Sequence, residues 1–171
     1  MIGETIVITG NGKGKTTAAL GLIIQAAGRG LRVYLGQFMK DGNYSEIKGL
    51  RSNFPGVAVE QYSGDLILGR LAENSDKATA AAGLRKAQAA LNEGNYDLIV
   101  LDEINVAAFM ELIPVEAVTD LIHNRPKNAT LVLTGRYAAP EAIAQADKTY
   151  EIGEIKHYYN QGTPARVGIE M

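Results

Sequence analysis

The stretch VITGNGKGKTTAAL, residues 7–20, constrains the fold of this chain more than any other feature. Its second half, Gly14-Lys15-Thr16, matches the end of the phosphate-binding loop pattern G-x-x-x-x-G-K-[ST], whereas Thr9 stands where that pattern begins with glycine. A β-branched run leads into the loop, and a segment rich in Ala, Leu and Ile leads out of it. A strand, a glycine-rich loop and a helix in this order predict a βα unit that binds phosphate.

Segments with strand and helix character alternate along the rest of the chain. After a first strand at 5–9, further strands are expected at 32–38, 57–62, 96–103, 130–135 and from 148 onward. Helices are expected at 15–27, 76–92, from Pro114 and at 140–146, and the polar segment 39–56 is a long loop or a loop with one short helix. No repeat or linker interrupts the pattern, so one domain over residues 1–171 is expected. The pattern predicts a three-layer α/β sandwich with a mostly parallel sheet, of the RecA-like P-loop NTPase kind.

Composition argues against several classes of function. The formal net charge of −2 gives no electrostatic reason to expect a nucleic acid or an anionic membrane as partner. The absence of cysteine excludes a disulfide framework, a thiolate metal site and a cysteine nucleophile. The chain reaches its first strand without a basic region followed by a long apolar stretch, and no apolar run is long enough to span a bilayer. These features predict a soluble cytoplasmic protein.

The glycine-rich loop carries the groups that hold a nucleotide. The amides of such a loop and the following helix N-terminus attract phosphate, Lys15 is expected to reach the terminal phosphates, and Thr16 to ligate Mg²⁺. Lys13 adds a second ammonium inside the loop. The alternative, a glycine-rich turn with exposed lysines, leaves the agreement of strand, loop and helix unexplained. ATP is therefore expected to contact Gly10, Asn11, Gly12, Lys13, Gly14, Lys15, Thr16 and Thr17.

A second part of the nucleotide site is expected in YDLIVLDE, residues 96–103. Its apolar residues predict a buried strand, and Asp102 and Glu103 follow at the carboxyl end, the edge at which open α/β sheets bind ligands. A carboxylate there can hold Mg²⁺ directly or through water, so Thr16, Asp102 and Glu103 form the candidate metal site. The alternative is a solvated acidic pair. Arg136 follows another strand at the same edge and either contacts ATP or is an ordinary surface residue.

Several short blocks together point to one known family. In chain order they read TGNGKGKTTAALG, QFMK, LIVLDEIN, NRP, LVLTGR and EIKHYYNQG, the last followed by GIE. With these blocks the chain resembles the P-loop type of ATP:corrinoid adenosyltransferase, from Ile6 to Glu170. The resemblance implies that ATP lies in the altered loop in a reversed sense, with C5′ of the adenosine exposed to a corrinoid. Reduced cobalt, Co(I), would attack C5′, form a Co–C bond and release tripolyphosphate.

The resemblance also implies roles for individual residues. Because Co(I) is itself the nucleophile, no catalytic base is needed, and Lys13 and Lys15 are the expected catalytic groups since they neutralise the departing tripolyphosphate. Mg²⁺ or Mn²⁺ is the expected metal, with Glu103 nearer to it than Asp102. A flavoprotein or another reductase is the expected partner, and a homodimer the expected assembly. The residues expected to contact the corrinoid are Phe38, Lys40, Leu66 and Ile67.

Two features depart from the pattern of that family. Only MIGE precedes the first strand, so the N-terminal lid of some members is expected to be absent. QYSGDLILGR lacks the aromatic residues that some members place there, which leaves Leu66 or Ile67 to form an apolar wall against the corrin. His157 is interpreted as a structural histidine rather than a cobalt ligand or base, and Tyr158 and Tyr159 as packing residues. The rival functions are an ordinary P-loop ATPase or kinase, and a nucleotide-dependent corrinoid-binding protein that is not an enzyme.

Overall fold

Six strands among the described residues form one parallel sheet in the order β3-β2-β4-β5-β1-β6. The computed structural model describes residues 3–40, 44–62, 72–156, 166 and 168. All neighbouring strands run parallel, so their carboxyl ends meet at one edge of the sheet. The strands are β1 (Thr5–Thr9), β2 (Val33–Phe38), β3 (Val57–Tyr62), β4 (Leu98–Asp102), β5 (Thr130–Thr134) and β6 (Lys148–Glu151).

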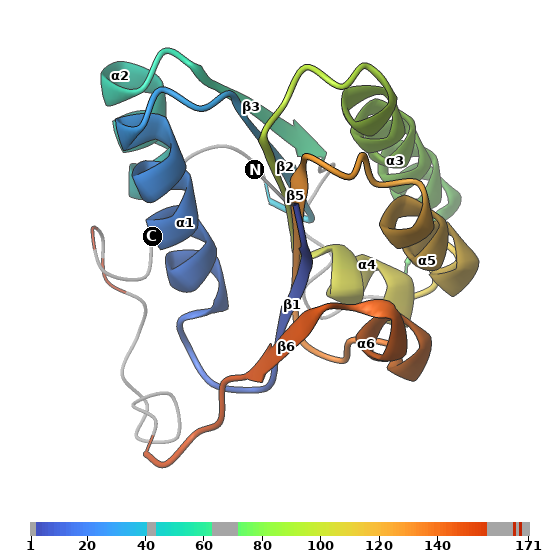
Figure 1. Ribbon diagram of the computed structural model, residues 1–171. Helices are drawn as coiled ribbons and strands as arrows, with labels where there is room; N and C mark the ends of the chain where they lie inside the picture. Colours follow the sequence, from blue (N-terminus) through green and yellow to red (C-terminus); the bar gives the residue numbers. More distant parts are fainter. Residues whose placement is uncertain (1–2, 41–43, 63–71, 157–165, 167, 169–171) are drawn as a thin grey trace.

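Helices cover both faces of the sheet and form the outer layers (Figure 1). On one face lie α1 (Lys15–Gly28) and α2 (Ser45–Asn53), and on the other α3 (Asn74–Asn92), α4 (Ile104–Phe109), α5 (Val115–His123) and α6 (Pro140–Gln145). Strand side chains alternate between two cores: Ile6 and Ile8 pack in the core that contains Ile23 of α1, and Val7 packs in the core on the opposite face. The predicted three-layer α/β sandwich is confirmed.

The boundaries of the expected elements agree with the structure to within two residues. The segment 39–56 contains one short helix, α2, which was one of the two alternatives for it. Helix α4 was not predicted. Its sequence, INVAAF, is too short to show a helical period. Its N-cap, Glu103, directly follows β4 and has a left-handed backbone instead of the usual N-cap conformation.

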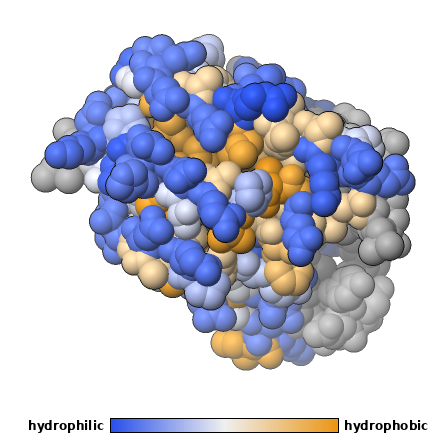
Figure 2. Space-filling view, turned by 90° about the vertical axis from the view of Figure 1, so that its right-hand side faces the viewer, coloured by the Kyte–Doolittle hydropathy of each residue, from blue (hydrophilic) through white to orange (hydrophobic). Residues whose placement is uncertain are grey.

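The helical layer formed by α3 and α5 is mainly hydrophilic on its outside. Figure 2 looks onto this side of the molecule and shows blue, polar side chains surrounding a group of apolar ones. The apolar side chains Val118, Leu121 and Ile122 of α5 are buried beneath this surface. No helix in the described part of the chain is long and apolar enough to cross a membrane.

Candidate active site

The phosphate loop is held against the segment that follows β6. The amide of Gly12 donates to the carbonyl oxygen of Ile152 at 2.7 Å, and the amide of Ile152 donates to that of Thr9 at 2.8 Å. A Cβ on Gly12 would lie 2.5 Å from the carbonyl oxygen of Gly153, so the backbones approach too closely for any other residue. Gly10 has a φ of 96°, which also favours glycine. The shape of the loop is therefore set by contacts within the protein.

Thr9 stands where the usual loop pattern has a glycine, and it has a structural role. It is the last residue of β1, and its Oγ1 accepts a hydrogen bond from the amide of Ala138 at 3.3 Å. Ala138 lies between β5 and α6, in the segment that also carries Arg136. The threonine side chain thus links the phosphate loop to the segment after β5, a contact that glycine could not make.

Lys15, the first residue of α1, points back into its own loop. The side chain is buried, and its Nζ donates to the carbonyl oxygens of Gly10 at 2.8 Å and Gly12 at 2.7 Å. Burial lowers the pKa of Lys15 below its usual value, and the charge of Arg136 lowers it further. The charge of Glu103 acts in the opposite direction but does not outweigh burial. A phosphate bound by the loop would compete with these carbonyl oxygens for the same ammonium.

Asp102, the last residue of β4, is fully buried and accepts four hydrogen bonds. Its Oδ1 accepts from Oγ1 of Thr16 at 3.0 Å and from Oγ1 of Thr134 at 2.6 Å. Its Oδ2 accepts from Nε2 of Gln37 at 3.0 Å and from Nζ of Lys40 at 2.7 Å. Burial by itself raises the pKa of this carboxyl, but the Lys40 ammonium and the hydrogen bonds lower it, and the net pKa lies below the usual range. Asp102 is therefore ionised at neutral pH.

Glu103 follows Asp102 directly but has a different environment. Its φ of 60° is left-handed, and its amide donates to Oγ1 of Thr134 at 3.1 Å. Burial and the charge of Asp102 raise the pKa of Glu103 above its usual value, although Lys40 and Lys15 act in the opposite direction. Two adjacent carboxyl groups with pKa values shifted apart, one of them on a strained backbone, are typical of a functional site.

Glu103→Gln is expected to stabilise the metal-free protein at neutral pH, because the fold disfavours the charged form of Glu103. Since the pKa is raised above its usual 4.5, ionisation weakens the fold as the pH rises above that value. We expect a gain of about 1 kcal/mol or less in the free energy of unfolding, the usual size for a substitution outside the core. Urea unfolding with a chelator present should show this gain vanish as the pH falls below 4.5. A lower stability of Glu103→Gln at neutral pH would contradict the expectation.

The structure brings together most of the residues predicted for ATP and metal. Lys15, Thr16, Asp102 and Glu103 meet at the carboxyl edge of the sheet, and Arg136 lies exposed after β5, with its charge acting on both Lys15 and Glu103. Of the other predicted residues, Asn11 and Lys13 in the loop and Thr17 in the first turn of α1 are exposed.

The residues predicted to contact the corrinoid are spread over different environments. Phe38 is fully buried in the core, where its ring packs edge-to-face on Tyr62 with centroids 5.1 Å apart, so it presents no surface to a ligand. Lys40 belongs to the polar network around Asp102. The remaining residues singled out from the sequence lie outside the described residues: Leu66, Ile67, His157, Tyr158 and Tyr159.

Two side chains of the site, Gln37 and Thr134, were not predicted. Gln37 is fully buried, donates to Asp102 and accepts a hydrogen bond from Nε2 of Gln61 at 2.9 Å. Thr134 donates to Asp102 and accepts from the amide of Glu103. Each is a polar residue near the carboxyl end of a mainly apolar strand. That pattern is the signal in the sequence that could have identified both.

The donor atoms at this edge suit Mg²⁺. The Thr16 hydroxyl and the carboxylates of Asp102 and Glu103 are hard oxygen ligands. Within the described ranges, no group of three or more His, Cys, Asp or Glu side chains could hold a metal ion. A nucleotide-bound Mg²⁺ takes only one or two carboxylates and completes its shell with phosphate oxygens and water. The residues present therefore fit a metal ion that arrives with a nucleotide.

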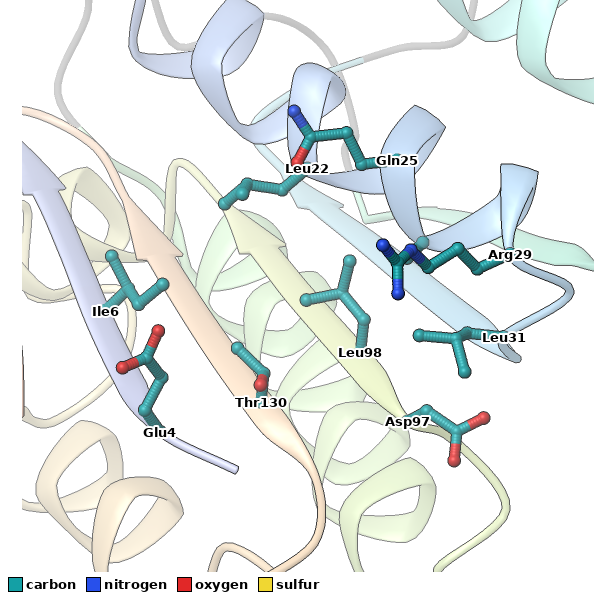
Figure 3. A pocket seen from close by; sticks show the side chains of 10 residues that line it. Glu4, Ile6, Leu22, Gln25, Arg29, Leu31, Asp97, Leu98 and Thr130 are labelled. Carbon is teal, nitrogen blue, oxygen red and sulfur yellow. The ribbon is translucent and has the colours of Figure 1, made fainter. Parts of the chain in front are cut away.

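A separate cavity of about 360 Å³ lies at the opposite end of the sheet (Figure 3). Leu22 and Gln25 of α1 and Arg29 directly after it line one side, and residues at the amino ends of the strands, among them Glu4 and Thr130, line the other. Its lining includes none of the residues of the phosphate loop or of the Asp102 network. This cavity is not part of the candidate active site.

Comparison with solved structures shows the fold. A KaiC-like protein from the hyperthermophilic archaeon Pyrococcus horikoshii OT3 superimposes with a TM-score of 0.60 at 16% sequence identity, covering 89% of this chain and 72% of that chain. The predicted P-loop NTPase-like α/β fold is thereby confirmed. At this identity the likeness concerns the fold alone.

Comparison of sequences shows the family. An uncharacterized protein of Nostoc sp. is 36% identical over 178 residues, covering 96% of this chain, and the chain spans about half of that relative, 47% of its length. Corrinoid adenosyltransferases of Escherichia coli K12 and Salmonella typhimurium LT2 are each 31% identical over 168 residues, covering 98% of this chain and 85% of theirs. The model of the enzyme family described as ATP:corrinoid adenosyltransferase BtuR/CobO/CobP matches residues 2–171. The chain belongs to the ATP:corrinoid adenosyltransferase family.

Proposed function

We propose that this protein transfers the 5′-deoxyadenosyl group of ATP to the Co(I) of a reduced corrinoid and releases tripolyphosphate. The observation that carries the proposal is the match of the adenosyltransferase family over residues 2–171. The phosphate loop and the acidic end of β4 lie at one edge of the sheet, where parallel α/β proteins bind nucleotides, which supports the same assignment.

The proposed reaction places few chemical demands on the protein. Co(I) donates an electron pair to C5′ and is oxidised to Co(III) as the Co–C bond forms. The bond between C5′ and the phosphate oxygen breaks, and tripolyphosphate leaves with its electron pair. No proton is removed, so no general base is required. The site must hold C5′ in line with cobalt and stabilise a leaving group of high negative charge.

Positive groups around the loop suit the second task. Lys15 is held inside the loop by the carbonyl oxygens of Gly10 and Gly12 and can exchange these acceptors for phosphate oxygens. Lys13 in the loop and Arg136 after β5 are both exposed and positively charged. We assign Lys15 and Lys13 to the stabilisation of tripolyphosphate, and Arg136 to binding of ATP.

We propose that Thr16 and Glu103 hold the Mg²⁺ of the nucleotide. Mg²⁺ would neutralise charge on the phosphates when bound. Of the two carboxylates, Glu103 is the better metal ligand, because each oxygen of Asp102 already accepts two hydrogen bonds. Asp102 then acts through its neighbours, since it orients the Thr16 hydroxyl. A reductase that supplies Co(I), and a homodimer, complete the proposal.

Product analysis tests this function directly. Anaerobic protein is given ATP, Mg²⁺ and chemically reduced cobalamin, the optical spectrum is followed, and the phosphate product is identified. A light-sensitive alkylcobalamin formed together with tripolyphosphate supports the proposal. Orthophosphate without alkylcobalamin would instead support an ordinary ATPase or kinase. Binding of both ATP and corrinoid without a Co–C bond would support a corrinoid-binding protein that is not an enzyme.

A further inference from the structure

The ammonium of Lys40 donates hydrogen bonds to a threonine hydroxyl and a strand-end carboxylate, the two kinds of group that commonly bind the metal ion in P-loop sites. Its Nζ donates to Oδ2 of Asp102 at 2.7 Å and to Oγ1 of Thr16 at 3.1 Å. Thr16 is the hydroxyl residue that follows the loop lysine, and Asp102 is the carboxylate at the end of β4. Thr16 in turn donates to Oδ1 of Asp102 at 3.0 Å, so the three side chains form a closed ring of polar contacts.

The position of Lys40 is built into the fold. Its side chain is 14% exposed and that of Asp102 is 0% exposed, so the ion pair is largely shielded from water. Met39, between the end of β2 and Lys40, has a left-handed φ of 57°, and its amide donates to the carbonyl oxygen of Tyr62 at 3.2 Å. A non-glycine residue held in this sparsely populated conformation is typical of functional segments. β2 pairs with β4, and the turn at Met39 follows the end of β2. Lys40 is thereby placed beside the carboxylate of Asp102 at the end of β4.

An ammonium in this place competes directly with a divalent ion. Both cations need the same lone pairs, and Asp102 has about four, which are all used by Thr16, Thr134, Gln37 and Lys40. A metal ion at Thr16 would also lie within a few ångströms of the ammonium, where like charges repel strongly. Metal binding at these oxygens therefore requires Lys40 to move.

We propose that Lys40, held by Asp102, keeps a divalent metal ion away from the Thr16 hydroxyl until a nucleotide binds. The inference rests on the proposed nucleotide function. Phosphates of the nucleotide offer the ammonium new acceptors and bring the metal its own oxygen ligands, so that Lys40 exchanges Asp102 for phosphate. Lys40 is then a positioning residue: it orients Thr16 and Asp102 beforehand and couples metal binding to nucleotide binding.

Binding of Mn²⁺ to the full chain without nucleotide tests the proposal. Electron paramagnetic resonance of free Mn²⁺ gives the affinity. Lys40→Met is expected to bind Mn²⁺ about tenfold more tightly than the unmodified protein, or better, because the loss of a unit charge at this distance is worth at least one decade. Lys40→Gln, which is also uncharged but can still donate to Asp102, should show the same gain, and Lys40→Arg should show none.

Two further variants serve as controls. Lys148→Met removes an ammonium that pairs with Glu4 at the amino end of the sheet, 2.7 Å away, and should leave Mn²⁺ binding unchanged. In an Asp102→Asn background, Lys40→Met should bring a smaller gain, because the carboxylate that fixes the ammonium beside Thr16 is no longer charged. Circular dichroism establishes that each variant is folded.

A folded Lys40→Met or Lys40→Gln that binds Mn²⁺ no more tightly than the unmodified protein would overturn the proposal. So would an equal gain in Lys148→Met, since that would reflect net charge alone. The experiment contains no corrinoid, so its outcome is separate from that of the transfer assay. If the unmodified protein formed no alkylcobalamin while Lys40→Met still gained Mn²⁺ affinity, the proposed function would be contradicted and the competition between Lys40 and the metal would stand.

Discussion

Lys15→Ala is expected to lower the kcat for alkylcobalamin formation by about a hundredfold to a thousandfold, the usual loss when one preorganised group that stabilises the leaving charge is removed. The ammonium of Lys15 is fixed in the loop by the carbonyl oxygens of Gly10 and Gly12, so it needs little reorganisation to meet the phosphates. The affinity for ATP should fall as well, because the same ammonium attracts the phosphates of ATP before the reaction. Anaerobic steady-state kinetics and equilibrium binding of ATP measure the two effects.

Two other variants show whether position or charge is responsible. Lys15→Arg keeps the charge but replaces a compact ammonium by a planar, longer group in a tightly packed loop, so most of the loss in kcat should remain. Lys13→Ala removes an exposed ammonium of the same loop and should have a smaller effect. A kcat of Lys15→Ala close to that of the unmodified protein would mean that the phosphates do not bind in this loop.

Phe38→Ala is expected to lower the free energy of unfolding by about 3–5 kcal/mol, as large-to-small substitutions of buried aromatic residues do. The Phe38 side chain is fully buried and packs edge-to-face on Tyr62, with an angle of 68° between the rings. Alanine would leave a cavity beneath the carboxyl end of β2, directly before Met39 and Lys40. Urea unfolding at constant m-value measures the loss.

The matched control is a phenylalanine at the surface. Phe109 at the end of α4 is 58% exposed and stacks on Tyr137, so Phe109→Ala should cost about 1 kcal/mol or less. Phe38→Leu keeps most of the buried volume, and its KM for the corrinoid should match that of the unmodified protein. A stable Phe38→Ala with a raised KM for the corrinoid would show that Phe38 is a ligand contact after all.

Local patterns in the sequence predicted most elements of the fold. Strands such as residues 57–62 are recognised because apolar, β-branched residues stand between glycine- and proline-rich segments, and this information is local. The order of the strands is a different matter. It places β4 next to β2 although β3 comes between them in the sequence, and it depends on how whole helices pack on the sheet. Helix α4 was missed because its six residues carry no period.

In the candidate site, too, some residues can be predicted from local sequence and others only from tertiary contacts. Lys15 and Thr16 belong to a contiguous motif, and Asp102 and Glu103 end an apolar strand, so each pair can be recognised from neighbouring residues alone. The contact between Lys40 and Asp102 joins residues 62 positions apart and exists only because β2 lies beside β4. The family resemblance pointed to Lys40 as a corrinoid contact, whereas its partners in the structure are Asp102 and Thr16.

The contact between the phosphate loop and the segment after β6 makes the edge of the sheet part of the ligand site. β6 has four residues, all exposed, and is the last strand in the sheet order, next to β1. Ile152 and Gly153 follow it directly and support the backbone of Gly12. Local opening of this edge would remove these contacts, so the stability of β6 and the shape of the loop are coupled. A nucleotide that binds only the intact phosphate loop shifts the equilibrium away from the form in which β6 is open, by mass action. It therefore stabilises β6, although this strand carries none of the side chains of the site.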